Sequence, residues 1–126
     1  MIAELFVCAS LTAVDGDTVR CDGQLMRLLG GGIPFASGID APEIGSHAKC
    51  LKERKLALIA KGRLKELLEE RGLRIEIKGY DSTPARRPLV NIYREDGREL
   101  GRMLQAEGFA REWRPHQKND WCRGKQ

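Results

Sequence analysis

The chain has 126 residues, of which 41% are hydrophobic and 32% are charged, and this balance fits one soluble globular domain. The first ten residues, MIAELFVCAS, lack a basic start and a long apolar run, so they predict neither a signal peptide nor a membrane span. Lysine and arginine exceed aspartate and glutamate by four. This excess favours a polyanionic partner without identifying one.

The cysteines bear on the compartment. Cys8, Cys21, Cys50 and Cys122 are spread along the chain. Their even number predicts one or two disulfides and so favours an exported protein, periplasmic or extracellular, whose signal peptide is absent from this chain. The alternative is a cytoplasmic protein with four buried thiols. A zinc site is not expected, because the sequence contains no C-x-x-C pair.

Short β-compatible runs occupy the first part of the chain. Residues 5–14 alternate loosely between apolar and polar side chains, and an apolar run covers residues 25–29. Two Asp-Gly turns, at residues 15–16 and 22–23, punctuate these runs. The pattern predicts a three-stranded antiparallel meander.

A helical pattern follows between Ser46, a possible N-cap, and Gly72, which lies just past the expected end. Steps of three and four residues connect the apolar side chains of one face: Leu56, Ile59, Ala60, Leu64, Leu67 and Leu68. This spacing predicts an amphipathic helix whose apolar face is buried.

The C-terminal part predicts two strands and a shorter helix. Residues 73–80 alternate apolar and charged side chains, and residues 87–93 form a second strand-like run. A turn at residues 96–97 precedes a short helix over residues 98–110. Its expected inward-facing residues are Leu100, Met103, Leu104 and Phe109. We expect no regular element in the polar tail, residues 111–126.

Three strands, a helix, two strands and a helix predict a β-rich α+β fold. The expected architecture is a five-stranded OB-type Greek-key barrel with a long helix between strands 3 and 4 and a short helix after strand 5. One domain is expected over residues 1–126, with barrel and helices in residues 1–110 and an irregular tail in residues 111–126.

Two acidic motifs stand out. Asp15 and Asp17 flank a glycine in VDGDT, and carboxylates on such a hairpin can offer oxygen ligands to a divalent cation. Asp40 and Glu43 lie three residues apart in IDAPE. Each motif also has a purely structural interpretation, as a tight turn in the first case and as an acidic approach to a helix in the second.

Arginines accompany these acids. Arg27 lies in RLLG, and Arg86 and Arg87 precede PLVNIY. A guanidinium matches phosphate oxygens in a bidentate geometry, although an arginine near a strand end is more often a solvated surface residue. The coincidence of arginines with acids is what favours a phosphate site.

The segments VDGDTVR, RLLG, IDAPE, RRPLVNIY and DGRELGRMLQAEGFA resemble the staphylococcal nuclease (thermonuclease) family in order and wording, across about residues 5 to 110. Members of that family are OB-fold barrels that use calcium to hydrolyse DNA and RNA, leaving 3′-phosphates. The resemblance implies a calcium-dependent endonuclease of low sequence specificity. We expect it to act on single-stranded nucleic acid, to be a monomer and to have no membrane partner.

The resemblance also implies roles for single residues. Calcium would be held by Asp17, Asp40 and the backbone carbonyl of Ala41, with Asp15 beside these ligands. Glu43 would activate or orient the attacking water. Arg27 and Arg87 would bind the scissile phosphate.

The sequence departs from the family pattern in several places. Removing residues 31–38 restores RLLGIDAPE, so we expect these residues to form a loop or wide bulge that still lets Arg27 and Asp40 converge. DSTPARRP precedes the second arginine strand; Arg87 is favoured over Arg86 as the phosphate ligand because it directly adjoins PLVNIY.

The helix that ends related proteins has no counterpart after Ala110. Trp113 falls where relatives place an aromatic against the base, and packing of the tail onto the barrel is an equal alternative. A disulfide through Cys122 would anchor the tail in place of the missing helix. His47 and His116 are expected to be solvated and not catalytic.

Two other classes remain open at this stage. One is a catalytically weak or inactive nuclease-like OB module that binds nucleic acid. The other is a disulfide-stabilised interaction domain without a nucleic acid partner.

Overall fold

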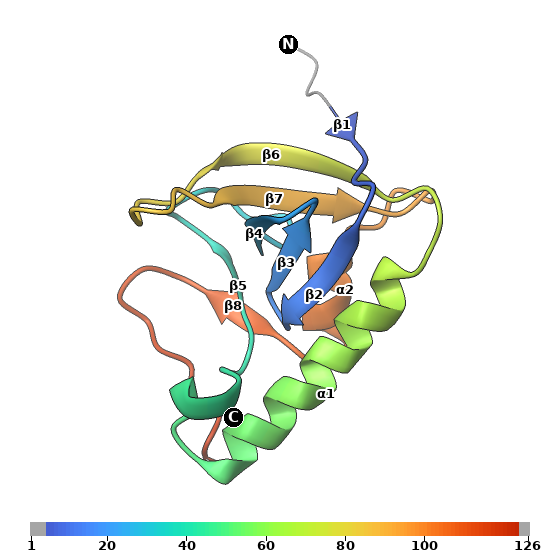
Figure 1. The fold of residues 1–126 in the computed structure, drawn as a ribbon. Coiled ribbons are helices and arrows are strands. Elements are labelled where there is room, and N and C mark those ends of the chain that lie inside the picture. The colour runs from blue at the N-terminus through green and yellow to red at the C-terminus, as the bar shows by residue number, and fades with distance from the viewer. Residues whose placement is uncertain (1–4, 124–126) are drawn as a thin grey trace.

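The computed structural model describes residues 5–123 (Figure 1). The elements in chain order are β1 (Leu5–Phe6), β2 (Leu11–Asp15), β3 (Thr18–Cys21), β4 (Gln24–Leu28), β5 (Gly38–Asp40), the short 3-10 helix η1 (Gly45–His47), α1 (Leu51–Leu68), β6 (Arg74–Tyr80), β7 (Pro88–Tyr93), α2 (Leu100–Ala106) and β8 (Arg111–Trp113). The β-rich α+β class predicted from the sequence is confirmed.

Six of the strands form one mixed sheet in the order β1-β6-β7-β4-β3-β2, in which β4 and β7 run parallel. The sheet does not close into a barrel. Its two edge strands, β1 and β2, are nonetheless joined by residues 7–10 alone, so the sheet must curl to bring its edges close. Figure 1 shows β1 above β6 and β2 beside β3, with the short connection between them.

The first predicted strand, residues 5–14, is therefore divided. Within residues 7–10 the Asp22 carboxylate accepts hydrogen bonds from the backbone N–H groups of Ala9 (3.3 Å) and Ser10 (2.7 Å). A disulfide also joins Cys8 to Cys21 in β3. The Asp22 carboxylate thus occupies two backbone N–H groups of this segment, which interrupts the strand between β1 and β2.

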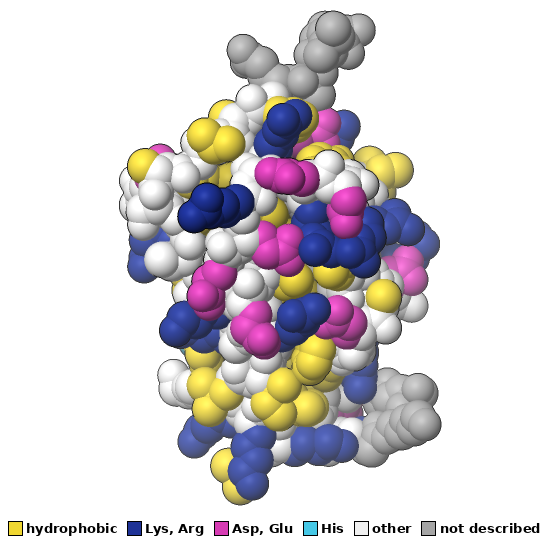
Figure 2. Space-filling model, turned by 90° about the vertical axis from the view of Figure 1, so that its right-hand side faces the viewer, with side chains coloured by type: hydrophobic (Ala, Val, Ile, Leu, Met, Phe, Trp, Pro, Cys, Tyr) yellow, Lys and Arg dark blue, Asp and Glu magenta, His cyan; other side chains and the backbone are white. Residues whose placement is uncertain are grey.

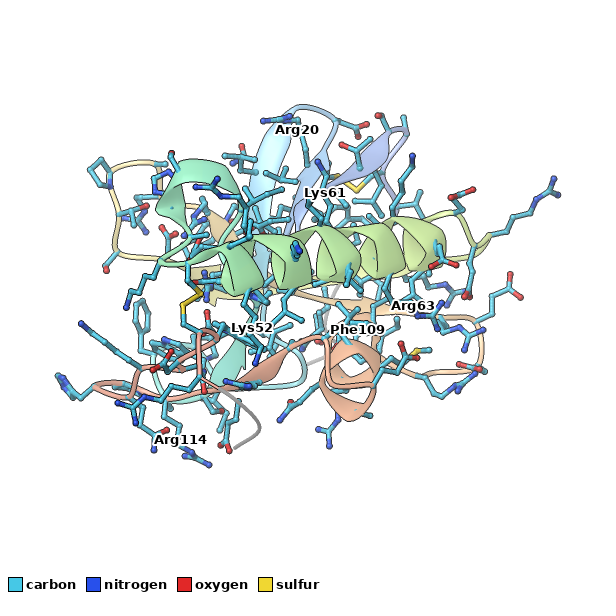
Figure 3. The ribbon with its side chains drawn as sticks, turned by 90° about the horizontal axis from the view of Figure 1, so that it is seen from below. Arg20, Lys52, Lys61, Arg63, Phe109 and Arg114 are labelled. Carbon is cyan, nitrogen blue, oxygen red and sulfur yellow. A yellow bond between two sulfur atoms is a disulfide. The ribbon has the colours of Figure 1, made fainter. Side chains whose placement is uncertain are left out.

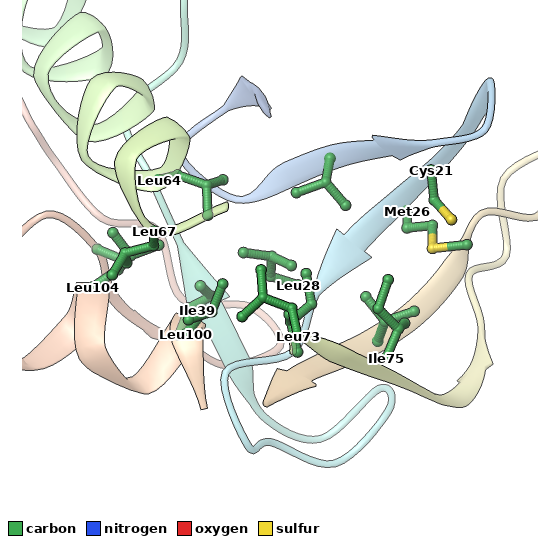
Figure 4. Close-up of a cluster of buried hydrophobic side chains, with 14 residues drawn as sticks. Cys21, Met26, Leu28, Ile39, Leu64, Leu67, Leu73, Ile75, Leu100 and Leu104 are labelled. Atoms are coloured by element: carbon green, nitrogen blue, oxygen red, sulfur yellow. The ribbon is translucent and has the colours of Figure 1, made fainter. Parts of the chain in front are cut away.

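The core lies between the concave side of the sheet and the two helices (Figure 4). It combines Leu28 and Ile75 of the sheet with Leu64 and Leu67 of α1, and α2 adds two more leucines, Leu100 and Leu104. Both α2 leucines were predicted to face inward.

On α1 the predicted face is at least partly buried along most of its length, with one exception. Ala57 and Ala60 are buried, whereas Ile59 is 54% exposed, contrary to the prediction. The reason is close packing: a Cβ added at Gly16, in the β2–β3 turn, would lie only 2.8 Å from the Cβ of Ala60. Small side chains must therefore face this turn, and the larger Ile59 is rotated toward solvent.

The start of α1 also differs from the prediction. The N-cap is Cys50 rather than Ser46, because residues 45–47 form η1 and Ala48 is extended. The sulfur of Cys50 accepts from the backbone N–H of Glu53 at 3.4 Å. The same sulfur forms a disulfide with Cys122 of the tail.

Both disulfides fall within the predicted number, and the alternative of four buried thiols is wrong. The prediction of an irregular tail is wrong for residues 111–113, which form β8 and pair antiparallel with β5. Figure 3 shows Lys52 of α1 directed toward the tail, where its Nζ donates to the carbonyl of Arg123 at 2.8 Å. Across residues 5–123, no helix is long and apolar enough to cross a membrane.

Candidate active site

Arg27 is the residue around which the candidate site is arranged. It lies on β4, and its side chain is 27% exposed. Its Nη2 donates to the backbone carbonyl of Ile39 at 3.3 Å and lies 3.7 Å from Oδ2 of Asp17. The guanidinium therefore contacts the segment that carries Asp40, as expected, despite the thirteen positions between these residues.

The excursion between Arg27 and Asp40 forms a loop rather than a bulge, because β4 ends at Leu28 and β5 pairs with β8 in a separate sheet. Its two ends lie against each other. A Cβ added at Gly30 would meet the side chain of Ile39 at 2.4 Å, and one added at Gly32 would meet the carbonyl of Ser37 at 2.4 Å. The chain thus returns almost to the point where it left.

Asp17 is buried in the turn between β2 and β3. Its Oδ2 accepts from the backbone N–H of Ala41 at 3.0 Å, and its Oδ1 accepts from the Thr18 hydroxyl at 3.1 Å. Asp15 accepts from the backbone N–H of Asp17 at 3.0 Å. The β-hairpin is thereby tied to the IDAPE segment, and the two acidic motifs meet.

Asp40 ends β5, and its Oδ2 accepts from the amide Nδ2 of Asn119 at 3.2 Å. Glu43 lies three residues further on, with an exposed side chain. Its backbone N–H donates to Oε2 of the buried Glu53 at 2.8 Å, and the other Glu53 oxygen accepts from the backbone N–H of Lys49 at 3.0 Å. Glu53 therefore fixes the loop that carries Glu43 to the start of α1.

The carboxyl groups shift one another's ionisation. Burial, followed by the charge of Asp17, raises the pKa of Asp15 to about 7. Burial also raises the pKa of Asp40, against the lowering effect of the Asn119 hydrogen bond. The pKa of Glu43, whose exposed side chain is partly shielded from water at the rim of the site, is raised by that partial desolvation and then by the charges of Asp17 and Asp40. The ionised forms of these carboxyl groups are therefore disfavoured here, although the charge of Arg27 acts to lower the pKa of Asp40 and of Glu43.

This donor set fits a hard cation. Asp17 and Asp40 offer carboxylate oxygens, and Ala41 adds a backbone carbonyl, which is the oxygen chemistry that calcium prefers. In the described part of the chain, no three side chains from His, Cys, Asp and Glu gather closely enough to hold a metal ion by themselves. The expected set does not require such a trio, because it contains two carboxylates and one carbonyl.

Arg87 and Arg86 lie in different environments. The Nε of Arg87 donates to Oδ2 of Asp81 at 2.7 Å, and Arg87 lines the same cleft as Arg27. Arg86 is exposed and has its guanidinium 6.0 Å from the centre of the Tyr80 ring. It does not line that cleft. The geometry therefore favours Arg87 as the partner of Arg27.

Two hollows meet at Arg27 and Trp113, which line both of them. One, of about 330 Å³, contains Asp40, Ala41 and Glu43. The other, of about 270 Å³, contains Arg87 and the exposed Phe35 of the loop. An elongated anion lying across the two hollows would have guanidinium groups in one and carboxylates in the other.

Two tail residues that reach the acidic hollow, Asn119 and Trp121, were not predicted as site residues from the sequence. Asn119 binds Asp40, and Trp121 is buried there with the Arg111 guanidinium 4.0 Å from its ring centre. Within residues 5–123, no acceptor meets hydrogen-bond geometry with the buried indole N–H of Trp121. The sequence feature that could have indicated them is Cys122, because a disulfide formed by Cys122 holds the neighbouring tail residues against the rest of the domain.

The charged side chains on one face of the molecule bear on the question of a polyanionic partner. On the face shown in Figure 2, acidic and basic side chains are intermingled rather than gathered into one basic field. His47 and His116 are exposed, as expected, and line neither hollow of the candidate site. No protein-family model and no curated protein sequence matches the chain.

Proposed function

We propose that the protein is a calcium-dependent nuclease of the staphylococcal nuclease type that hydrolyses DNA and RNA with little sequence specificity and leaves 3′-phosphates. The observation that carries this proposal is the meeting of the two hollows at Arg27. Its guanidinium lies between the acidic hollow, which contains Asp40 and Glu43, and the cleft that contains Arg87. Phosphodiester hydrolysis needs both kinds of group on either side of one phosphorus atom.

In the proposed reaction Arg27 and Arg87 bind the equatorial oxygens of the phosphate, where negative charge grows in the transition state. Glu43 holds the attacking water and accepts its proton as the water oxygen bonds to phosphorus, a role that suits an exposed carboxylate at the rim of the acidic hollow. The bond between phosphorus and the 5′ oxygen breaks, the departing 5′ oxygen takes a proton from solvent, and the phosphate stays on the 3′ oxygen. Calcium, bound by Asp17, Asp40 and the Ala41 carbonyl, would supply Lewis acidity. Asn119 and Asp15 hold the carboxylate and backbone groups in place.

We also propose that the curled six-stranded sheet is a variant of the OB barrel, left open between β1 and β2. The support is the short connection between these edge strands and the packing of α1 against β2 and the β2–β3 turn. Two disulfides weakly favour an oxidising compartment and so the periplasm or the exterior of the cell.

The test is a nuclease assay on single-stranded DNA, duplex DNA and RNA with calcium, with magnesium and with a chelator. Cleavage with calcium that stops on chelation is the expected result, fastest on single strands. Intact substrates after hours with calcium would show that the protein is not this enzyme.

A second candidate is a module that binds nucleic acid without cleaving it. It is favoured by the pairing of both arginines inside the protein, Arg87 with Asp81 and Arg27 with Asp17. Phosphate must compete with these carboxylates. Salt-dependent binding of an oligonucleotide that is never cut, and that Glu43→Gln leaves unchanged, would select this candidate.

A further inference from the structure

Phe35 is the residue from which this inference starts. It lies at the far part of the loop formed by residues 31–38, and its side chain is 59% exposed. The loop is closed by local hydrogen bonds, from the backbone N–H of Ile33 to the Ser37 hydroxyl and from the N–H groups of Ala36 and Ser37 to the Ile33 carbonyl. Phe35 is thus held on an ordered turn in spite of its exposure.

Phe35 is exposed at a cleft that contains two arginines. Together with Trp113 of β8 it lines the 270 Å³ cleft that also contains Arg27 and Arg87. Ile33 of the same loop is 65% exposed but lines a different hollow, on the α2 side. Both residues therefore expose an apolar side chain, but of the two only Phe35 lines the cleft that contains Arg27 and Arg87.

The side chains that line the cleft indicate which class of ligand it can bind. Two guanidinium groups suit an anion, and two aromatic side chains suit a flat, unsaturated ring. A simple anion would make no use of the aromatic side chains, and an apolar ligand would make no use of the two guanidinium groups. A nucleotide unit offers both parts, a phosphate and a base, on one covalent frame.

We propose that Phe35 stacks on an unpaired base of the bound strand, opposite or beside Trp113, and so makes the cleft selective for single-stranded nucleic acid. The faces of a base within a duplex are already covered by its neighbours, so such a base cannot enter without unstacking. This inference rests on the proposed function for the phosphate site. It adds a specificity residue supplied by the inserted loop.

The experiment is a double-mutant cycle between Phe35 and the base. Binding of a short labelled single-stranded oligonucleotide is measured by fluorescence anisotropy, in the Glu43→Gln background with calcium so that the oligonucleotide survives. A second oligonucleotide of equal length has abasic positions throughout its centre. The protein variants are Phe35→Ala, Phe35→Tyr and, as a matched control from the same loop, Ile33→Ala.

We expect Phe35→Ala to weaken binding of the normal oligonucleotide about tenfold. Phe35→Tyr and Ile33→Ala should bind as the parent does, and Phe35→Ala should not weaken binding of the abasic oligonucleotide further. An equal loss on both oligonucleotides, or no loss on the normal one, would overturn the stacking role, as would absence of binding. Binding that follows the expected pattern in a protein that never cleaves would refute the proposed catalysis and leave the stacking role standing.

Discussion

At the scale of single residues, Asp81 decides how Arg87 is presented to the cleft. Its Oδ1 accepts from the backbone N–H and hydroxyl of Thr83 and from the backbone N–H of Arg87, and its Oδ2 accepts from Arg87 Nε. The Asp81 side chain is only 11% exposed. Burial alone would raise the pKa of Asp81, but the hydrogen bonds from Arg87 and Thr83 lower it below 3.8.

The first prediction follows from the sign of this shift. Because the folded pKa is below the unfolded one, the network stabilises the fold above about pH 4, and this contribution is lost as the pH falls through the folded pKa. Asp81→Asn should therefore lower the free energy of unfolding at pH 7 by about 1–3 kcal/mol, and by less in acid. Urea unfolding at several pH values measures this. A loss independent of pH would contradict it, and Ser82→Ala is the control.

At the scale of elements, the inserted loop shows what local sequence can and cannot specify. The glycines at its ends predicted a tolerated excursion, and the contacts between Gly30 and Ile39 agree with that prediction. The sequence could not reveal that the loop is also attached to the sheet. The backbone N–H of Gly31 donates to Oδ1 of the buried Asn91 at 2.9 Å, a contact between residues sixty positions apart.

The second prediction is the outcome of deleting residues 31–38. Because a Cβ added at Gly30 would lie only 2.4 Å from the Ile39 side chain, the two cut ends are close together, and we expect them to join and the variant to fold cooperatively. It should be less stable by about 1–3 kcal/mol, since the Asn91 side chain loses the N–H of Gly31. Circular dichroism with urea unfolding tests this. If cooperative unfolding disappears, the loop is part of the core rather than an addition to it.

Most strands and helices could be predicted from the local pattern of apolar and polar residues. The predicted strands at residues 73–80 and 87–93 agree with β6 and β7 within a residue. Apolar and charged residues alternate in β6, whereas β7 is a short run that is buried on both faces. The start of α1 and the strand β8 were not predictable in this way. Cys50 caps α1 while bonded to Cys122, and β8 is a strand because β5 pairs with it. Both depend on distant partners.

At the scale of the whole molecule, the tail and the site are one structure. The disulfide between Cys50 and Cys122 spans 72 positions, and the hydrogen bond from Asn119 to Asp40 spans 79. The acids and arginines of the candidate site were identified from short motifs. The tail residues that hold them were not, because nothing local marks an asparagine as the partner of a remote carboxylate.

The third prediction compares the two disulfides. Closing 72 positions restricts the unfolded chain more than closing the 13 positions between Cys8 and Cys21. Replacing the Cys50–Cys122 pair by serines should cost about 4 kcal/mol of unfolding free energy, against about 3 kcal/mol for the Cys8–Cys21 pair. Serine at position 50 can still cap α1, so the measured loss of stability should not include a contribution from an uncapped helix. Urea unfolding gives both values, and the reverse order would refute this account of the tail.

The central claim is that the groups around Arg27 cleave phosphodiesters, and the most direct test is the rate of single-strand cleavage with calcium by the unaltered protein and by Glu43→Gln. Glu43 is exposed and its backbone contacts do not involve its own side chain, so the variant should fold and bind substrate normally. Loss of the proton acceptor should slow cleavage by about a hundredfold or more, with substrate affinity retained. Equal cleavage rates for the two proteins, or no cleavage by either, would contradict the claim.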